Sequence, residues 1–202
     1  MFTIGSAGFL YADLHEWRKN NRAGCGGIFD DDIRDDFEKQ IGHYYGDPAT
    51  CWGQYRRKEN GYNFAFSAFG SFLYLVGSIL FIPATDEIVL GTWVFIFGSL
   101  AIFLSQTWKV YRQGCYDENN LSKREFNLKN FAADYPALGV DAFAGLGGLA
   151  YLIGSVYFLP QFAVNDDVVT LAAFLFTVGG TFFTLSGLFI LYRYFCTLNY
   201  AH

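Results

Sequence analysis

Four long stretches without a charged side chain constrain this chain more than any other feature. They run over residues 60–85, 88–108, 142–165 and 168–192, and each contains at least 21 residues. A helix needs about 20 apolar residues to cross the ~30 Å hydrocarbon core of a bilayer. A soluble core could enclose one such stretch, but not four that are paired around short loops. We therefore predict an all-α polytopic membrane protein with four transmembrane helices.

The composition agrees with this class of protein. Charged residues make up only 16% of the chain, against roughly 25% in ordinary soluble domains. The strands of a membrane barrel alternate in polarity over ~10 residues, whereas these stretches are apolar throughout. Helices are therefore favoured over barrel strands.

The basic residues predict how the protein is oriented. All 14 Lys and Arg fall outside the two short loops, 83–87 and 160–167, and these loops carry only acidic charges. Arg56, Arg57 and Lys58 directly precede the first span, at the level of the lipid headgroups. Basic residues near span ends stay on the cytoplasmic face or its organellar equivalent. We expect both termini on the cytoplasmic, matrix or stromal side of a plasma membrane or an organellar inner membrane.

The chain also contains an internal repeat. Residues 69–83 match residues 146–160 at seven of fifteen positions, at an offset of 77. The second loop is four residues longer, and beyond it the match continues at an offset of 81. Glycines, serines and a loop proline recur in order, which indicates a duplication. Because each unit holds two spans, we predict two parallel-repeat hairpins, related by a pseudo-twofold axis along the membrane normal.

The repeated residues lie on one stripe of each predicted helix. Gly70, Tyr74, Gly77 and Phe81 advance by four, three and four positions, which keeps them on one helical face. Helices in lipid associate where small residues let backbones approach and where hydroxyls form hydrogen bonds. We interpret the stripe as a helix-packing seam, with a substrate or pigment groove as the alternative. The predicted seam comprises Gly70, Tyr74, Gly77, Ser78, Phe81, Gly98, Ser105, Gly147, Tyr151, Gly154, Ser155, Phe158, Gly179 and Ser186.

The hairpins resemble a known family. The segments that carry the likeness are YLVGSILF (74–81), VFIFGSLAIF (94–103) and YLIGSVYF (151–158). They are similar to the YrhK-like domain, a short two-helix membrane unit with Gly-Ser in the middle of each helix. The resemblance covers residues 62–112 and, more loosely, 142–193, where Gly180 stands in place of the serine. It implies a tandem duplicated membrane hairpin and no assigned activity.

Two further helices are predicted on the inner side. Residues 30–45 place apolar side chains at successive steps of four behind an acidic first turn, which is typical of an amphipathic helix at a membrane surface. Ser122 and Glu125 form a capping box that opens a helix in the connector. We divide the chain into an inner-side segment 1–58, a first hairpin 59–112, an inner-side connector 113–138, a second hairpin 139–195 and a tail 196–202.

The spans lack the side chains that most intramembrane chemistry needs. His15, His43 and His202 lie outside the spans, and the single Met is Met1, so no axial haem ligand is available within them. No charged residue lies at the centre of a span, which argues against proton relays and voltage sensors. Asp141, at the inner end of the third span, is expected to cap its helix. The four cysteines are widely spaced, which predicts unpaired thiols rather than a zinc site.

We therefore expect a non-catalytic protein, an accessory or structural subunit of a larger membrane complex or of a homo-oligomer. Its partners are membrane lipids and other transmembrane subunits or itself, and no nucleic acid. We expect no catalytic residue, no metal and no resident cofactor, and leave a bound lipid, isoprenoid or pigment open. The alternative is a small channel or passive transporter for a neutral solute. Its lining would be Ser67, Ser71, Tyr74, Ser78, Ser105 and Gln106.

Overall fold

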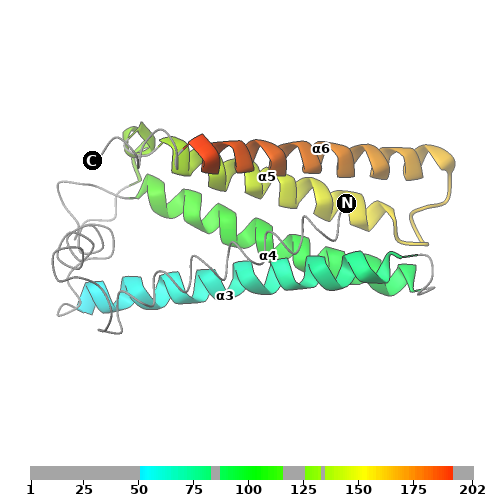
Figure 1. Ribbon diagram of the computed structural model, residues 1–202, viewed down its shortest axis with the longest axis horizontal. Helices are drawn as coiled ribbons and strands as arrows, with labels where there is room; N and C mark the ends of the chain where they lie inside the picture. The colour runs from blue at the N-terminus through cyan, green and yellow to red at the C-terminus, as the bar shows by residue number, and fades with distance from the viewer. Residues whose placement is uncertain (1–50, 83–86, 116–125, 133–134, 193–202) are drawn as a thin grey trace.

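The computed structural model describes residues 51–82, 87–115, 126–132 and 135–192, with side chains from residue 61 onward. This part of the chain is helical and contains no strand. Its four long helices are α3 (Cys51–Leu80), α4 (Ile88–Gly114), α5 (Tyr135–Tyr157) and α6 (Asp166–Tyr192), and a short 3-10 helix, η2, covers Leu128–Ala132 (Figure 1). The amphipathic helix predicted over residues 30–45 and the capping box at Ser122 and Glu125 lie outside the described residues.

Each long helix contains a segment that can cross a bilayer by its length and composition. These candidate spans are Gly61–Leu80, Ile88–Gly114, Tyr135–Tyr157 and Asp166–Tyr192, with 20, 27, 23 and 27 residues. At about 1.5 Å per residue, each is at least as long as the hydrocarbon core is thick. The predicted all-helical chain with four apolar spans is confirmed, and it suggests an integral membrane protein.

Two helices begin earlier than the charge pattern indicated. Helix α3 starts at Cys51, so the predicted headgroup residues Arg56, Arg57 and Lys58 belong to the helix itself, ahead of its apolar span. Their side chains lie outside the described part.

Helix α5 starts at Tyr135 and places Pro136 in its first turn. Backbone N–H groups in the first turn have no acceptor within the helix, so a proline there costs no helical hydrogen bond. Asp141 consequently lies in the second turn of α5. The expectation that Asp141 caps the helix is wrong, because the apolar residues 137–140 allow the helix to begin before the carboxylate.

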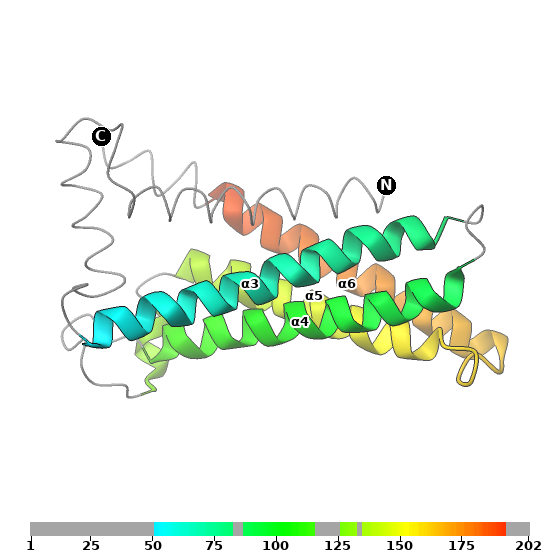
Figure 2. The ribbon, with the colours of Figure 1, turned by 90° about the horizontal axis from the view of Figure 1, so that it is seen from below.

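The helices form an antiparallel bundle in which chain neighbours pack together (Figures 1 and 2). Helix α3 packs on α4, α4 on α5, and α5 on α6. Among the described residues no comparable interface joins α3 to α6, although the rings of Tyr74 and Phe183 approach to 6.2 Å. In a closed bundle with twofold symmetry, α3 would pack on α6 as α5 packs on α4.

The core lies where the helices meet and is mainly aromatic. Its buried residues are Tyr74, Phe95, Ile102 and Tyr151, and further Phe side chains pack against them. Helix α6 is the least covered span. Only 11% of its most apolar window is buried, against 39% to 50% in the other three. Much of α6 therefore faces whatever surrounds the bundle.

Candidate functional site

The first part of the candidate seam closes α3 on α4. A Cβ atom placed on Gly70 would lie 3.0 Å from the carbonyl oxygen of Gly98, and one on Gly98 would lie 3.2 Å from that of Gly70. Farther along, a Cβ on Gly77 would lie 2.7 Å from the ring of Phe95. Any larger residue would meet fixed backbone or a packed ring. Glycine therefore sets the distance between these two helices.

The second part closes α5 on α6 by the same kind of contact. A Cβ on Gly147 or on Gly179 would lie 3.1 Å from the carbonyl oxygen of the other glycine. A Cβ on Gly154 would lie 3.1 Å from the ring of Phe176. Each of these residues stands 77 or 81 positions after its counterpart in the first hairpin. The two hairpins thus make equivalent glycine contacts.

A serine hydrogen bond joins the two helices of each hairpin near the end that lies away from the hairpin loop. The Ser105 hydroxyl lies 2.8 Å from Oδ1 and 3.2 Å from the carbonyl oxygen of Asn63, both of which can accept its proton. The Ser186 hydroxyl donates to the carbonyl oxygen of Val140 over 2.8 Å. Asn63 and Val140 are equivalent at the offset of 77. The bond is therefore placed alike in both hairpins.

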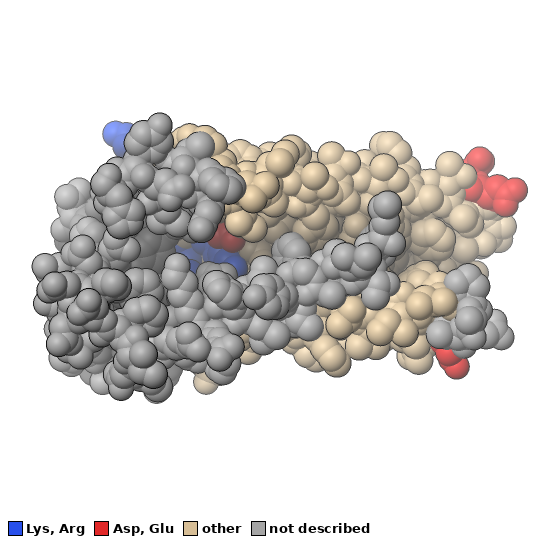
Figure 3. Space-filling view, viewed as in Figure 1, with Lys and Arg blue, Asp and Glu red and all other residues tan. Residues whose placement is uncertain are grey.

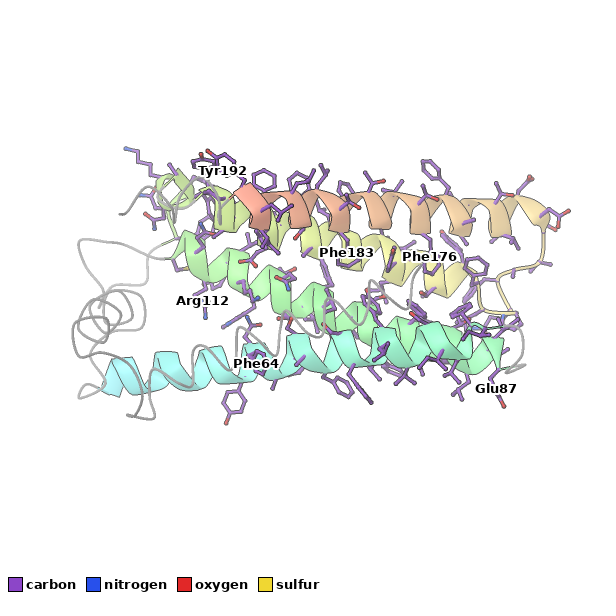
Figure 4. All side chains as sticks on the ribbon, in the orientation of Figure 1. Phe64, Glu87, Arg112, Phe176, Phe183 and Tyr192 are labelled. Carbon is purple, nitrogen blue, oxygen red and sulfur yellow. The ribbon has the colours of Figure 1, made fainter. Side chains whose placement is uncertain are left out.

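Aromatic rings fill the space between the hairpins. The ring centroids of Tyr74 and Tyr151 are 5.8 Å apart, and those of Phe95 and Phe176 are 6.1 Å apart. In both pairs, equivalent residues of the two hairpins face each other. Figure 4 shows Phe176 and Phe183 on the side of α6 that faces the other helices. Ring pairs at these separations stabilise a core by about 0.5–1.5 kcal/mol each beyond their buried area.

The hydroxyl contacts beside the seam differ between the hairpins. The Tyr74 hydroxyl donates to Ser99 over 3.0 Å, but the residue equivalent to Ser99 is Gly180. The Ser78 hydroxyl donates to the carbonyl oxygen of Tyr74 over 2.7 Å. Its equivalent, Ser155, has a buried hydroxyl without a hydrogen-bond partner in the described part of the chain. The glycine contacts recur in both hairpins, and these hydrogen bonds do not.

A group of polar side chains lies at one end of the interface between α4 and α5, away from the hairpin loops. Lys109 Nζ is 3.9 Å from an Asp141 carboxylate oxygen, with the side chains 22% and 17% exposed. One turn away, Gln106 is 3% exposed, and its Oε1 atom has no hydrogen-bond partner among the described residues. Figure 3 shows acidic and basic surface meeting toward this end, whereas the other described acids lie at the opposite end.

Twelve of the fourteen predicted seam residues lie in the four helices, and all twelve are buried. Phe81 and Phe158 directly follow α3 and α5 and are half-buried. Sequence comparison missed Ile102 and Phe183, which occupy equivalent positions and pack against Gly70 and Gly147. The two residues align with each other at the offset of 81. They escaped notice because the comparison selected identical residues, and these two differ.

The described residues bring together no cluster with recognisable chemistry. They contain no group of three or more His, Cys, Asp or Glu that could hold a metal ion. Cys115 is a buried free thiol at the end of α4. The side chains of Cys25, Cys51 and Cys196 lie outside the described part. The arrangement is thus a packing site built from glycine, serine and aromatic residues.

Comparison with known proteins supports the family resemblance of the first hairpin. Residues 62–113 match the family model described as YrhK-like protein. This range covers nearly all of the span of α3 and reaches almost to the end of α4. No curated protein and no solved structure matches the chain. The looser resemblance of residues 142–193 stays a prediction. The first hairpin of this chain, residues 62–113, is a YrhK-like segment.

Proposed function

We propose that this chain is a non-catalytic membrane subunit, in which two YrhK-like hairpins form a four-helix scaffold for assembly with other transmembrane chains or with itself. The observation that carries the proposal is that small and polar residues of the spans form contacts between the helices. The glycines set the distances between helices, and Ser99, Ser105 and Ser186 take part in hydrogen bonds that join one helix to another. These contacts support a role of the small and polar residues in holding a scaffold together.

We infer that the second hairpin arose by duplication of the first. The recurrence of the glycine–carbonyl, glycine–ring and serine–carbonyl contacts at matched positions supports this. So do the ring pairs Tyr74–Tyr151 and Phe95–Phe176, because equivalent residues meet each other next to a twofold axis. In the proposed arrangement an approximate twofold axis runs along the membrane normal, as expected for a parallel repeat.

The proposed orientation places both termini on the cytoplasmic, matrix or stromal side. Glu87, Asp166 and Asp167 border the hairpin loops at one end of the bundle, and Figure 3 shows acidic surface there. The described basic residues, Lys109, Arg112 and Lys129, lie at the other end of the helices. This asymmetry supports the orientation, because basic residues flank spans on the inner side. The host would be a plasma membrane or an organellar inner membrane.

The proposed partners contact the outer faces of the helices. Large apolar side chains are exposed on all four helices, including Phe66, Phe97, Ile153 and Phe174. Such surface suits lipid tails and partner helices. The channel alternative has less support, because aromatic rings fill the space between the hairpins. The serine residues expected to line a pore are buried.

Purification from native membranes in a mild detergent tests the proposal. We expect a discrete assembly larger than one chain, containing either another membrane protein or further copies. Vesicles reconstituted with the purified protein should show no faster flux of small neutral solutes than empty vesicles. A stable monomer that conducts such a solute, and loses this flux when Ser78 and Ser155 are both replaced by leucine, would overturn the proposal in favour of a channel.

A further inference from the structure

Gln106 of α4 has a buried amide oxygen that needs a hydrogen-bond donor. Its side chain is 3% exposed, and no described residue donates a hydrogen bond to Oε1. A buried oxygen that has lost its hydrogen bonds to water destabilises the fold unless another donor replaces them. The backbone around Gln106 cannot supply this donor, because its N–H groups bond to carbonyl groups within α4. The donor must therefore come from outside the helix.

The interface between α4 and α5 has room for a small molecule beside Gln106. The residue of α5 that faces Gln106 is Gly145, which is buried. A Cβ on Gly145 would lie 3.4 Å from Gln106 Cβ and would meet no other described atom within 4 Å outside the adjoining backbone. Nearer the loop end of α5, a Cβ on Gly148 would meet three atoms of α4 at 3.2–3.4 Å. The two helices are closely packed at Gly148 and leave space for at least a methyl group at Gly145.

Water can reach the neighbourhood of this space. Lys109 follows Gln106 by one turn of α4, and Asp141 precedes Gly145 by one turn of α5. Their side chains are 22% and 17% exposed, and Figure 3 shows acidic and basic surface here. Lys109 Nζ lies 3.9 Å from the carboxylate oxygen, whereas a direct hydrogen bond between such charged groups spans about 2.7–2.9 Å. A water molecule can bridge polar groups at the longer separation.

The second buried polar atom without a described partner, the Ser155 hydroxyl, needs no such molecule. Its equivalent, Ser78, donates to the carbonyl oxygen of Tyr74 four residues earlier. By turning about its side-chain bond, Ser155 can donate to the carbonyl oxygen of Tyr151 in the same way. An amide oxygen only accepts hydrogen bonds. Rotation therefore cannot pair Gln106 Oε1 with a carbonyl group.

We propose that a water molecule binds between α4 and α5 beside Gly145 and donates a hydrogen bond to Gln106 Oε1. Water fits this site because the space is small and the atom to be paired is an acceptor. It enters from the side of Lys109 and Asp141. Ile102, one turn deeper in α4, is fully buried and closes the site toward the aromatic core. The site is thus a hydrated end of the interface and belongs to a single chain, whichever partner the proposed subunit binds.

Water-edited solid-state NMR of the full chain in lipid bilayers tests the site. In this measurement, magnetisation passes from water protons to nearby carbon atoms, and the rate at which each signal grows reports how close water lies. The protein carries carbon-13 in its glutamine and isoleucine residues. Gln106→Met and Ile102→Val identify the two signals of interest by their loss. We expect the Gln106 Cδ signal to grow at least about twofold faster than that of the fully buried Ile102.

A matched pair of glycine substitutions locates the water. Gly145→Ala places a methyl group in the space beside Gln106. Gly180→Ala adds the same group on α6, where its Cβ would also have one described contact at 3.4 Å, to Tyr151 Oη. We expect Gly145→Ala to slow the growth of the Gln106 signal about twofold and Gly180→Ala to leave it unchanged.

Two results would overturn the inference. In the unmodified protein, growth of the Gln106 signal as slow as that of Ile102 would show that the amide oxygen lies in a dry interface. If Gly145→Ala left the Gln106 rate unchanged, or slowed it no more than Gly180→Ala does, water would not occupy the space beside Gly145.

Discussion

The two hairpins share a seam but surround it with different side chains. In the first, polar residues flank the glycines on α3 and α4; in the second, the equivalent positions are small or apolar. The pairs are Asn63/Val140, Ser67/Ala144, Ser71/Gly148, Ser99/Gly180, Gln106/Gly187 and Lys109/Ile190. The feature present in both hairpins, close glycine contact, is what the hairpin fold itself requires. The feature present in one adds hydrogen bonds to the same frame.

The second hairpin contains a group of stacked rings. Phe143 stacks on Phe189 at 5.5 Å and on Phe182 at 6.1 Å, near the end of α5 and α6 that lies away from the loop between them. A Cβ on Gly139 would lie 2.5 Å from the Phe189 ring, so glycine also makes room for this stack. Ring stacking therefore contributes to the contact between α5 and α6 at this end of the second hairpin.

Removing a central ring should have the largest effect and should affect both hairpins. Tyr74→Ala and Tyr151→Ala each delete a buried ring from the aromatic core. We expect each to lower the free energy of unfolding by about 3 kcal/mol or more, because cavities of this size stay largely unfilled. Titration with denaturing detergent in mixed micelles measures the change. A loss below about 1 kcal/mol at either position would show that the hairpin containing that tyrosine does not depend on the shared core.

The serine hydrogen bonds should contribute different amounts of stability to the two hairpins. Ser105→Ala leaves Asn63 Oδ1, a buried side-chain oxygen, without its donor, whereas Ser186→Ala removes a donor only from a backbone carbonyl group. We expect a loss of about 1–2 kcal/mol for the first substitution and about 0.6 kcal/mol for the second. Ser105→Ala combined with Asn63→Leu should recover part of the loss. Equal losses would mean that the polar flank of the first hairpin adds no stability.

The ion pair between Lys109 and Asp141 should contribute least to stability. Lys109→Met and Asp141→Asn each break the 3.9 Å contact between α4 and α5. Because both side chains are partly exposed, we expect a loss of about 0.5 kcal/mol, reduced further at high salt. The same unfolding titration at low and high ionic strength measures this. A loss that exceeds the serine effect would show that charge pairing, and not close packing, joins the two hairpins.

Sequence reasoning predicted the parts of this fold that depend on the bilayer. The four spans follow from uncharged stretches that match the thickness of the hydrocarbon, and the first hairpin matches the family that its Gly-Ser segments resemble. The residues at which α3 and α5 begin were not predictable from the charge pattern. Pro136 can open a helix ahead of Asp141, and α3 continues through the basic residues before its span.

The contacts between the two hairpins could not be predicted from the sequence either. A repeat shows which residues are equivalent, but not whether α6 packs on α3 as α5 packs on α4. That outcome depends on the shapes of facing side chains. The Ile102 and Phe183 pair illustrates this, because these equivalent residues have different volumes at the point where the hairpins meet. Gln106 Oε1, which has no hydrogen-bond partner among the described residues, is a second example, because the sequence alone does not reveal that this atom is buried.

A pair of glycine substitutions tests whether the two seams are equivalent. Gly98→Leu forces a side chain against Tyr74 and the carbonyl oxygen of Gly70, and Gly179→Leu does the same against Tyr151 and that of Gly147. Gly187→Leu, which adds the same side chain in open space of α6, is the matched control. If the seams are equivalent, both seam variants should lose about 3 kcal/mol of unfolding free energy, whereas the control should lose less than about 0.5 kcal/mol. A large loss at Gly98 with none at Gly179, or equal losses in all three variants, would contradict it.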